Sequence, residues 1–216
     1  MRAALCETLW RAGDYERACL VKLAPQATSG ELKDRLAGLR DETPNGCALS
    51  DVVASFKDCC VFCHFSDRRE FLDQLGQMLE EEGDKGLGSD LGVLLVLLSL
   101  LMSRGFGKVQ SDRDDTTQPL ITSPFGHASQ EIVNLFLSGK AATNVFDGNM
   151  EMGADYTLKG ISTRAQVGFL TLLESLNYMT VGTFLKEPEY PVWVLGSENH
   201  YTVLFSLERN VQVGWM

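Results

Sequence analysis

The segment that most constrains the fold is residues 91–102, the most apolar stretch of the chain and one rich in leucine. As a helix it would extend about 18 Å, whereas the hydrocarbon core of a bilayer is about 30 Å thick. The segment is too short to span a membrane and too apolar to lie at a surface, so it predicts a buried helix. The rest of the chain must enclose it, and 216 residues of which 44% are hydrophobic suffice for such a core.

The charge and the cysteine content limit which binding partners and which cellular location we expect. The chain has 29 acidic and 19 basic residues, for a net charge of −10. Proteins that bind nucleic acid need a basic face, so we expect no nucleic-acid partner, and we expect no membrane segment. The six cysteines come without an export signal. We therefore expect reduced thiols and a location in the cytoplasm or the nucleus.

The pattern of apolar residues predicts helices first and strands last, which is typical of an α+β fold. Helices are predicted over these segments: 1–24, 28–40, 67–82, 91–102, 129–137 and 162–178. Residues 51–63 fit a helix or a strand equally well. Residues 106–124 are predicted to form a surface loop, and residues 140–160 irregular structure or short strands.

Two β-rich runs close the chain. Residues 192–195 and 201–207 are rich in residues that favour strands, and the polar residues 196–199 between them have the composition of a turn. Together they predict a β-hairpin.

The motif Cys60-Val61-Phe62-Cys63-His64 matches the pattern by which haem is attached covalently, and Cys59 adds a third thiol. A zinc site would need a second pair of ligands at metal spacing, which the remaining cysteines do not supply. The alternative, which we favour, is that these cysteines are small buried hydrophobic residues. We therefore expect neither a metal nor a cofactor.

Two further residues are candidates for chemistry. Cys47 precedes a possible helix start, where a thiol can have a lowered pKa and act as a nucleophile; the alternative is a turn residue packed at that start. His127 precedes the helix predicted at 129–137. It could cap that helix or bind a partner, and the structural role is favoured.

His200 stands at the entrance of the last predicted strand, directly after the polar turn. A strand holds such a side chain in place while leaving it accessible, as a general base requires. From the residues alone, a histidine at a strand edge is more often only a surface residue.

The second half of the chain resembles the MINDY family of deubiquitinating cysteine proteases, in particular its branch with the longer catalytic domain. The resemblance spans about 91–206 and rests on several blocks in the same order. The blocks are Gly92-Val93-Leu94-Leu95, Pro119-Leu120-Ile121, Gly126-His127-Ala128-Ser129-Gln130, Ala142-Thr143-Asn144-Val145-Phe146-Asp147-Gly148, Val167-Gly168-Phe169-Leu170-Thr171-Leu172, Val181-Gly182, and Pro191-Val192-Trp193-Val194-Leu195-Gly196-Ser197-Glu198-Asn199-His200-Tyr201-Thr202-Val203.

The resemblance implies a papain-like Cys-His enzyme that hydrolyses isopeptide bonds in polyubiquitin, with preference for chains linked through lysine 48 of ubiquitin. Ubiquitin and polyubiquitin chains would be its partners. His200 aligns with the catalytic histidine of the family, which favours the catalytic role over that of a surface residue. Residues 91–216 would be the C-terminal part of the catalytic domain, and residues 1–90 a helical portion with a weaker match.

The sequence departs from the family at the nucleophile. The family carries a Gly-Pro-Cys block preceded by a glutamine, whereas Cys47 follows Asn45-Gly46 and has no proline beside it. We therefore expect the nucleophile to lie upstream of Met1 and this chain to be inactive by itself, as a fragment or a pseudo-enzyme. The alternative function is a non-catalytic module that binds ubiquitin or another partner.

Other residues of the matching blocks have less specific roles. Trp193 and Glu198 flank His200 and could support its ring, while nothing in the sequence identifies the third member of a triad. Asn144 and Asp147 could shape a substrate groove or form a tight turn.

Overall fold

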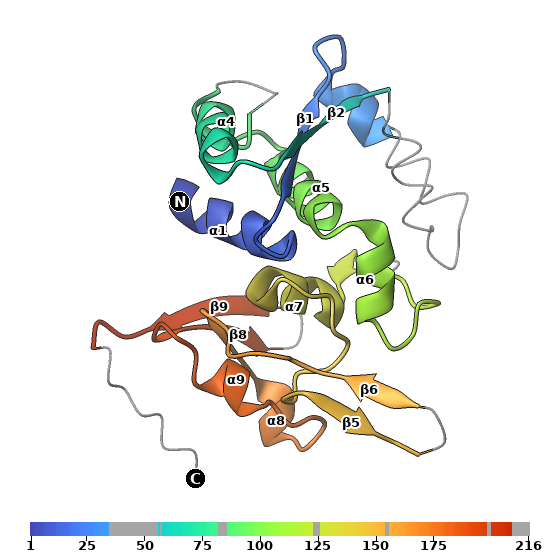
Figure 1. Cartoon of the computed structure of the whole chain (residues 1–216), viewed down its shortest axis with the longest axis vertical. Coiled ribbons are helices and arrows are strands. Elements are labelled where there is room, and N and C mark those ends of the chain that lie inside the picture. Colours follow the sequence, from blue (N-terminus) through green and yellow to red (C-terminus); the bar gives the residue numbers. More distant parts are fainter. Residues whose placement is uncertain are drawn as a thin grey trace. The chain divides into compact units, whose positions relative to one another are not determined.

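A computed structural model (Figure 1) describes residues 1–34, 56, 58–81, 86–122, 126–153, 156–197 and 200–208. The chain divides into two compact units. Unit 1 comprises Met1–Gln110 and Thr117–Gly126, and unit 2 comprises Ser111–Thr116 and His127–Met216. Helices and strands are mixed in both, in agreement with the predicted α+β class.

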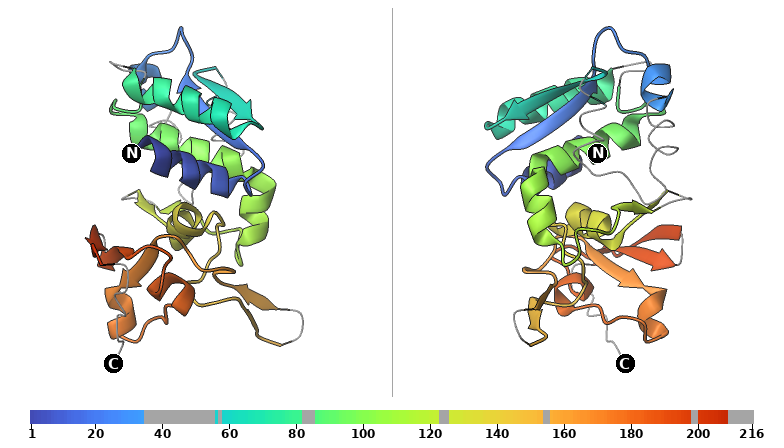
Figure 2. Two further views of the ribbon diagram at one scale, coloured as in Figure 1. Left: turned by 60° about the vertical axis from the view of Figure 1, so that its left-hand side comes forward. Right: turned by 90° about the vertical axis from the view of Figure 1, so that its right-hand side faces the viewer.

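Unit 1 combines a small antiparallel sheet with helices. Its elements are α1 (Arg2–Ala12), β1 (Ala18–Leu23), β2 (Cys60–Phe65), α4 (Arg68–Glu80), α5 (Gly92–Arg104), most of α6 (Phe106–Asp112), and β3 (Ile121–Thr122). β1 and β2 pair in antiparallel register, and β1 also packs against α5. Figure 2 shows α1 alongside both α4 and α5, next to the β1–β2 pair.

Helix α5 is the predicted buried helix, and the prediction is confirmed. Leu95 and Leu100 are fully buried, and the helix ends at Arg104, with Gly105 as its C-cap. Two serines on the same helix meet β1. The Val21 N–H donates to Ser99 Oγ at 2.9 Å, and the Cys19 N–H donates to Ser103 Oγ at 2.8 Å. Two strand amides that do not face β2 are thereby satisfied inside the core.

The prediction that residues 1–24 are helical is wrong in its second half. The helix ends at Ala12, and β1 begins six residues later, so residues 1–90 are not a purely helical portion. In β1 both faces are buried, one of the situations in which strand residues do not alternate between apolar and polar. Pairing with β2 and burial against α5 override the local spacing.

The turn between α1 and β1 is held by an ionic cluster. Asp14 and Tyr15 both have positive φ, at 58° and 63°. The Asp14 carboxylate accepts from Arg104 at 2.6 Å and from Lys108. Burial acts to raise the pKa of Asp14, but these two cations outweigh it and hold the pKa below its usual value.

Several predicted helix ends are confirmed. Asp67 caps α4 and accepts from the Glu70 N–H at 2.8 Å. Residues 29–34 are helical, and Thr28 and Glu31 exchange side-chain-to-backbone hydrogen bonds as a capping box. Gly139 ends α7 with φ of 79°, in the left-handed region that favours glycine.

Unit 2 holds α7 and three-stranded and two-stranded sheets. Its elements are β4 (His127–Ala128), α7 (Gln130–Ser138), β5 (Asn149–Glu151), β6 (Thr157–Lys159), β7 (Gly168–Thr171), α8 (Leu172–Ser175), α9 (Thr183–Lys186), β8 (Val192–Ser197) and β9 (His200–Phe205). β5 pairs with β6. β7 is parallel to β8, and β8 is antiparallel to β9, which confirms the predicted hairpin.

Two other predictions are wrong. Residues 106–124 are not only a loop, because α6 occupies Phe106–Asp112. Residues 162–178 are not one helix: strand β7 occupies Gly168–Thr171, and only Leu172–Ser175 is helical. The apolar residues of this segment fit helical spacing, but Phe169 packs in the core of unit 2 from a strand that pairs with β8.

Within the described part of the chain, no single helix is long and apolar enough to cross a membrane. Helices α5 and α6 would reach that length and hydropathy only as a pair, and they are bent by 83° at the break between them.

We predict that Ser99→Ala destabilises the protein by about 1–3 kcal/mol, because the buried Val21 N–H loses its acceptor. Urea unfolding of the 216-residue chain measures this. Ser66→Ala, at an exposed position of the same unit, is the matched control and should leave the free energy of unfolding almost unchanged. Equal stability of the two variants would contradict the role given to Ser99.

Candidate functional site

The candidate site lies where β9 begins. His200 is the first residue of β9, and its backbone pairs with Ser197, the last residue of β8. The side chain of His200 is exposed. A paired backbone with an accessible imidazole is the arrangement predicted for a general base. The neighbouring Glu198 lies outside the described residues.

Trp193 does not support His200. It lies opposite Leu204, four residues along β8 from Ser197, which corresponds to about 14 Å of strand. Its ring is buried, and its Nε1–H donates to the Lys186 carbonyl at 2.8 Å. On β7, a Cβ on Gly168 would lie 2.4 Å from the Trp193 ring, so this close approach requires glycine. Trp193 thus joins β7, β8 and α9.

Asp147 anchors the start of α9. Its carboxylate accepts from the Thr183 N–H at 2.8 Å, from the Thr183 hydroxyl at 2.5 Å and from the Phe184 N–H at 2.9 Å. A Cβ on Gly182 would lie 2.1 Å from Asp147 Oδ1, so glycine is needed for the carboxylate to reach the helix end. The side chain of Asp147 therefore serves as a structural cap.

Asn144 also has a structural position. Its Nδ2 donates to Asp114 Oδ2 at 2.7 Å and to the Lys159 carbonyl at 3.0 Å. Asp114 Oδ1 in turn accepts from the Lys159 N–H at 2.9 Å. Asp114, which lies in the segment predicted as a surface loop, is thus hydrogen-bonded to the rest of unit 2. The fully buried Asn134 adds a further tie, donating to the Asn144 carbonyl at 3.1 Å.

Sequence reasoning missed a buried ion pair in the same unit. Arg113 Nε lies 3.9 Å from Glu131 Oε1, and both side chains are almost fully buried. The two residues are eighteen positions apart in the sequence, and no local spacing connects them. The only signal was that Glu131 lies on the apolar helix α7, where a charge needs a partner.

The Cys-x-x-Cys-His motif lies on strand β2, not on a helix. Cys60 is buried, Cys63 is partly buried and His64 is exposed. Residues three apart on a strand point to opposite faces, so Cys60 and Cys63 cannot hold one group between them without a change of backbone. Among the residues that the structure describes, no group of three His, Cys, Asp or Glu side chains could hold a metal ion.

Two buried cysteines of unit 1, Cys19 and Cys60, are poor nucleophiles. Burial, with a smaller effect of Cys63, raises the pKa of Cys19 to about 12. Burial, with a smaller effect of Cys59, raises the pKa of Cys60 to about 11. Both thiols therefore stay protonated at neutral pH and act as packing residues. Cys47 lies outside the described residues.

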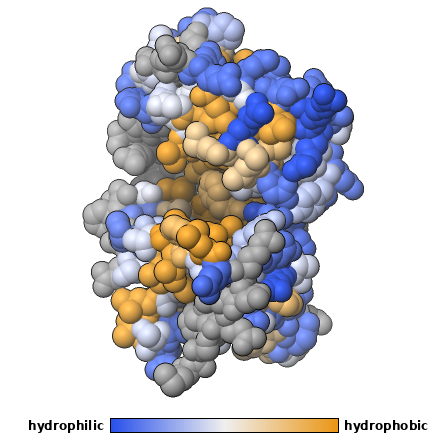
Figure 3. All heavy atoms as spheres, turned by 90° about the vertical axis from the view of Figure 1, so that its left-hand side faces the viewer, coloured by the Kyte–Doolittle hydropathy of each residue, from blue (hydrophilic) through white to orange (hydrophobic). Residues whose placement is uncertain are grey.

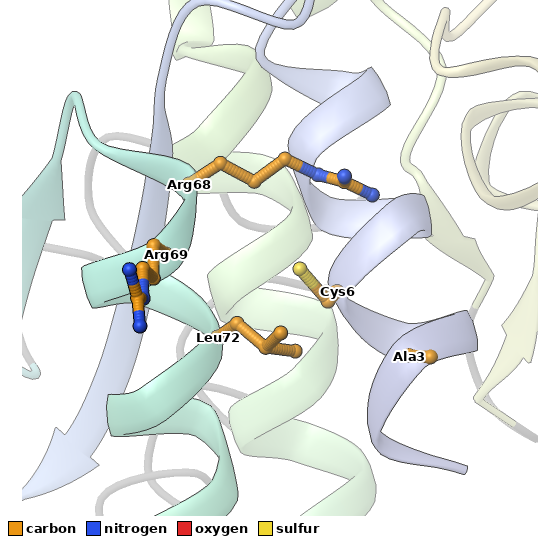
Figure 4. Close-up of a pocket in the computed structure, with 5 residues that line it drawn as sticks. All are labelled: Ala3, Cys6, Arg68, Arg69 and Leu72. Carbon is orange, nitrogen blue, oxygen red and sulfur yellow. The ribbon is translucent and has the colours of Figure 1, made fainter.

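A pocket between α1 and α4 contains another cysteine (Figure 4). Ala3, Cys6, Arg68, Arg69 and Leu72 line this space of about 410 Å³. The sulfur of Cys6 points from α1 towards α4, while Arg68 reaches across and pairs with Glu7 at 2.6 Å. Burial raises the pKa of Cys6 despite the opposing effect of the arginine. No base is among the lining residues, so this pocket does not provide a thiol–base pair.

His127 lies on β4 and is exposed. The N-cap residue of α7 is Ser129, so His127 does not cap that helix.

The whole chain matches a known domain family. Residues 1–216 match the family model described as "Deubiquitinating enzyme MINDY-3/4, conserved domain". The similarity thus extends beyond residues 91–206 and includes the N-terminal part. No solved structure matches the chain.

Curated relatives agree with this match. The chain is 36% identical over 216 residues to "Probable ubiquitin carboxyl-terminal hydrolase MINDY-4" of Bos taurus, which covers 98% of this chain and 26% of the relative. It is 48% identical over 117 residues to "Ubiquitin carboxyl-terminal hydrolase MINDY-3" of Danio rerio, covering 54% of this chain and 26% of the relative. The human MINDY-3 is 45% identical over 119 residues, covering 55% of this chain and 26% of the relative. The chain spans about a quarter of the length of these relatives.

We predict that Asp147→Ala destabilises the protein by about 2 kcal/mol, because three donors at the start of α9 lose a charged acceptor. Thermal unfolding of the purified chain measures the loss. Glu189→Ala removes an exposed carboxylate from the same unit and should change stability little. A result in which both variants unfold alike would show that the cap contributes nothing.

Proposed function

Because the chain belongs to the MINDY-3/4 family of deubiquitinating enzymes, we propose that it contributes the catalytic histidine of a cysteine-type deubiquitinase. The observation that carries the proposal is the position of His200. Its backbone is paired in a sheet at the start of β9 while its imidazole is exposed. The surrounding block of residues is one of those through which the sequence resembles the family.

In the proposed mechanism, neutral His200 accepts the proton of a cysteine thiol as the sulfur attacks the isopeptide carbonyl. The protonated imidazole then donates that proton to the departing lysine amine, and a thioester with ubiquitin forms. Water, deprotonated by His200, cleaves the thioester and returns the thiol. The fold that would bring these groups together is of the papain-like class, as the family resemblance implies.

The proposed substrate is polyubiquitin linked through lysine 48 of ubiquitin. This preference follows from the resemblance stated for the sequence, as does ubiquitin as the partner. The names of the curated relatives describe them as ubiquitin carboxyl-terminal hydrolases, which supports ubiquitin as the substrate class. A location in the cytoplasm or nucleus fits an enzyme that depends on a reduced thiol.

The second group that the proposed mechanism needs is a reactive cysteine. The sequence contains no Gly-Pro-Cys block. Cys19 and Cys60 have strongly raised pKa values, and burial also raises that of Cys6. Because that block is missing, we propose that residues 1–216 by themselves lack the nucleophile of the family and are inactive.

The second candidate function is a non-catalytic module that binds ubiquitin. The lack of a nucleophile block in the sequence favours it. The two functions differ in one respect that can be measured: only the first requires His200 for turnover in a chain that carries the nucleophile.

We predict that residues 1–216 do not cleave a lysine-48-linked ubiquitin tetramer, which gel electrophoresis of the reaction would show. A thioester cannot form without a reactive thiol. Cleavage that persists in this chain and disappears in the Cys47→Ala variant would overturn this assignment.

We predict further that His200→Ala lowers turnover by at least about a hundredfold in a longer chain that includes a Gly-Pro-Cys block, because both proton transfers depend on the imidazole. Release of a fluorophore from the C-terminus of ubiquitin measures this rate. His64→Ala removes an exposed histidine from β2 and serves as the control. Normal turnover of the His200→Ala variant would leave the ubiquitin-binding module as the better function.

A further inference from the structure

Among the described residues, strand β9 is paired along one edge only. It is the outer strand of the sheet β7–β8–β9, and its only described pairing is with β8. All of its six residues, His200–Phe205, are exposed. Among the described residues, none offers a backbone partner to the other edge of β9, so its outward N–H and C=O groups are available for pairing.

The strand is also apolar on its surface. Tyr201, Val203 and Phe205 alternate along β9 and so share one face, with exposed fractions of 47%, 66% and 63%. Leu204 is half exposed on the opposite face, and Leu207 lies just beyond the strand end at 92% exposed. Figure 3, viewed from the left-hand side of Figure 1, shows hydrophobic side chains gathered on part of the surface seen from that side.

The sequence of β9 lacks the residues that usually protect an edge strand. Natural edges are commonly guarded by a lysine, a proline or a bulge. The sequence of β9, His-Tyr-Thr-Val-Leu-Phe, contains no proline and no Lys, Arg, Asp or Glu, and its register with β8 runs without a bulge. An unguarded, apolar and regular edge is typical of sheets that accept an additional strand.

We propose that β9 is a docking edge for an extended peptide segment that adds a fourth strand to the β7–β8–β9 sheet. The segment has apolar residues at alternate positions, which pack beside Tyr201, Val203 and Phe205, and basic residues between them. The chain's net charge of −10 selects against an acidic segment. Glu208, exposed three residues after β9, adds a negative charge where the segment would end.

This docking edge is separate from the proposed catalysis. It uses the outer backbone of β9 and the side chains after His200, and it requires neither a nucleophile nor proton transfer. Failure of the docking experiment would therefore leave the proposed function unaffected.

The probe is a synthetic hexapeptide that alternates arginine and valine, added to the purified 216-residue chain. We expect slower hydrogen exchange of those backbone amides of β9 that point away from β8, and little change in α5 or α7. The same peptide with N-methyl groups on every second amide cannot pair along that edge and should bind about tenfold more weakly. A peptide that alternates glutamate and valine should also bind more weakly, because its charge matches that of the chain.

Two substitutions locate the site on the protein. Val203→Lys should weaken binding of the arginine–valine peptide by about tenfold, because it places a cation on the docking edge. Val93→Lys is the matched control: Val93 is 84% exposed but lies on α5 in unit 1, so binding should not change. The peptide with N-methyl groups gives the same test without altering the protein.

Three results would overturn the proposal. They are protection that maps outside β9, equal binding of the methylated and unmethylated peptides, and equal binding of the acidic and basic peptides. Protection of β9 that rises with protein concentration in the absence of peptide would show that a second copy of the chain takes the edge, and it would equally overturn the peptide as the occupant.

Discussion

The structure of unit 1 depends on the contact between α5 and β1. The leucine-rich helix α5 is buried in part by β1. The edge of β1 that does not pair with β2 would otherwise have unpaired backbone amides in the core. Ser99 and Ser103 resolve this conflict, because their hydroxyls accept from the amides of Val21 and Cys19. An apolar core and a hydrogen-bonded strand edge are thus satisfied by the same helix. The second strand β2, which carries the Cys-x-x-Cys-His motif, is positioned by pairing with β1.

In unit 2, polar side chains that are mostly half-buried hold the elements together. Asp147 fixes α9, Asn144 and Asp114 join the polar segment before residue 117 to β6, and Trp193 links three elements through one ring. These contacts position β8, and the register between β8 and β9 then determines where His200 stands. The residues that the family resemblance groups around His200 are therefore of two kinds: some hold the framework, and His200 lies on its accessible end.

Sequence reasoning succeeded where local chemistry decides the structure. The cap at Asp67, the end of α7 at Gly139, the apolar helix and the terminal hairpin were all predictable, because each depends on residues close together in the chain. It failed for β1 and for β7, which carry apolar residues at spacings that also fit a helix. Both segments form strands because they pair with strands distant in the sequence, and a local sequence pattern does not reveal such pairing.

The sequence by itself determined the family, the mixed helix and strand class and His200 as the candidate histidine, because these depend on residue identities in a fixed order. Only the tertiary structure decided that Trp193 lies away from His200, that Asp147 and Asn144 are framework residues, and that Arg113 and Glu131 meet in the core. The same holds for the outer edge of β9, which has no partner among the described residues. The physical reason is that burial and strand pairing bring together residues far apart in the chain. The distance between two side chains and their exposure to solvent cannot be read from the order of the residues.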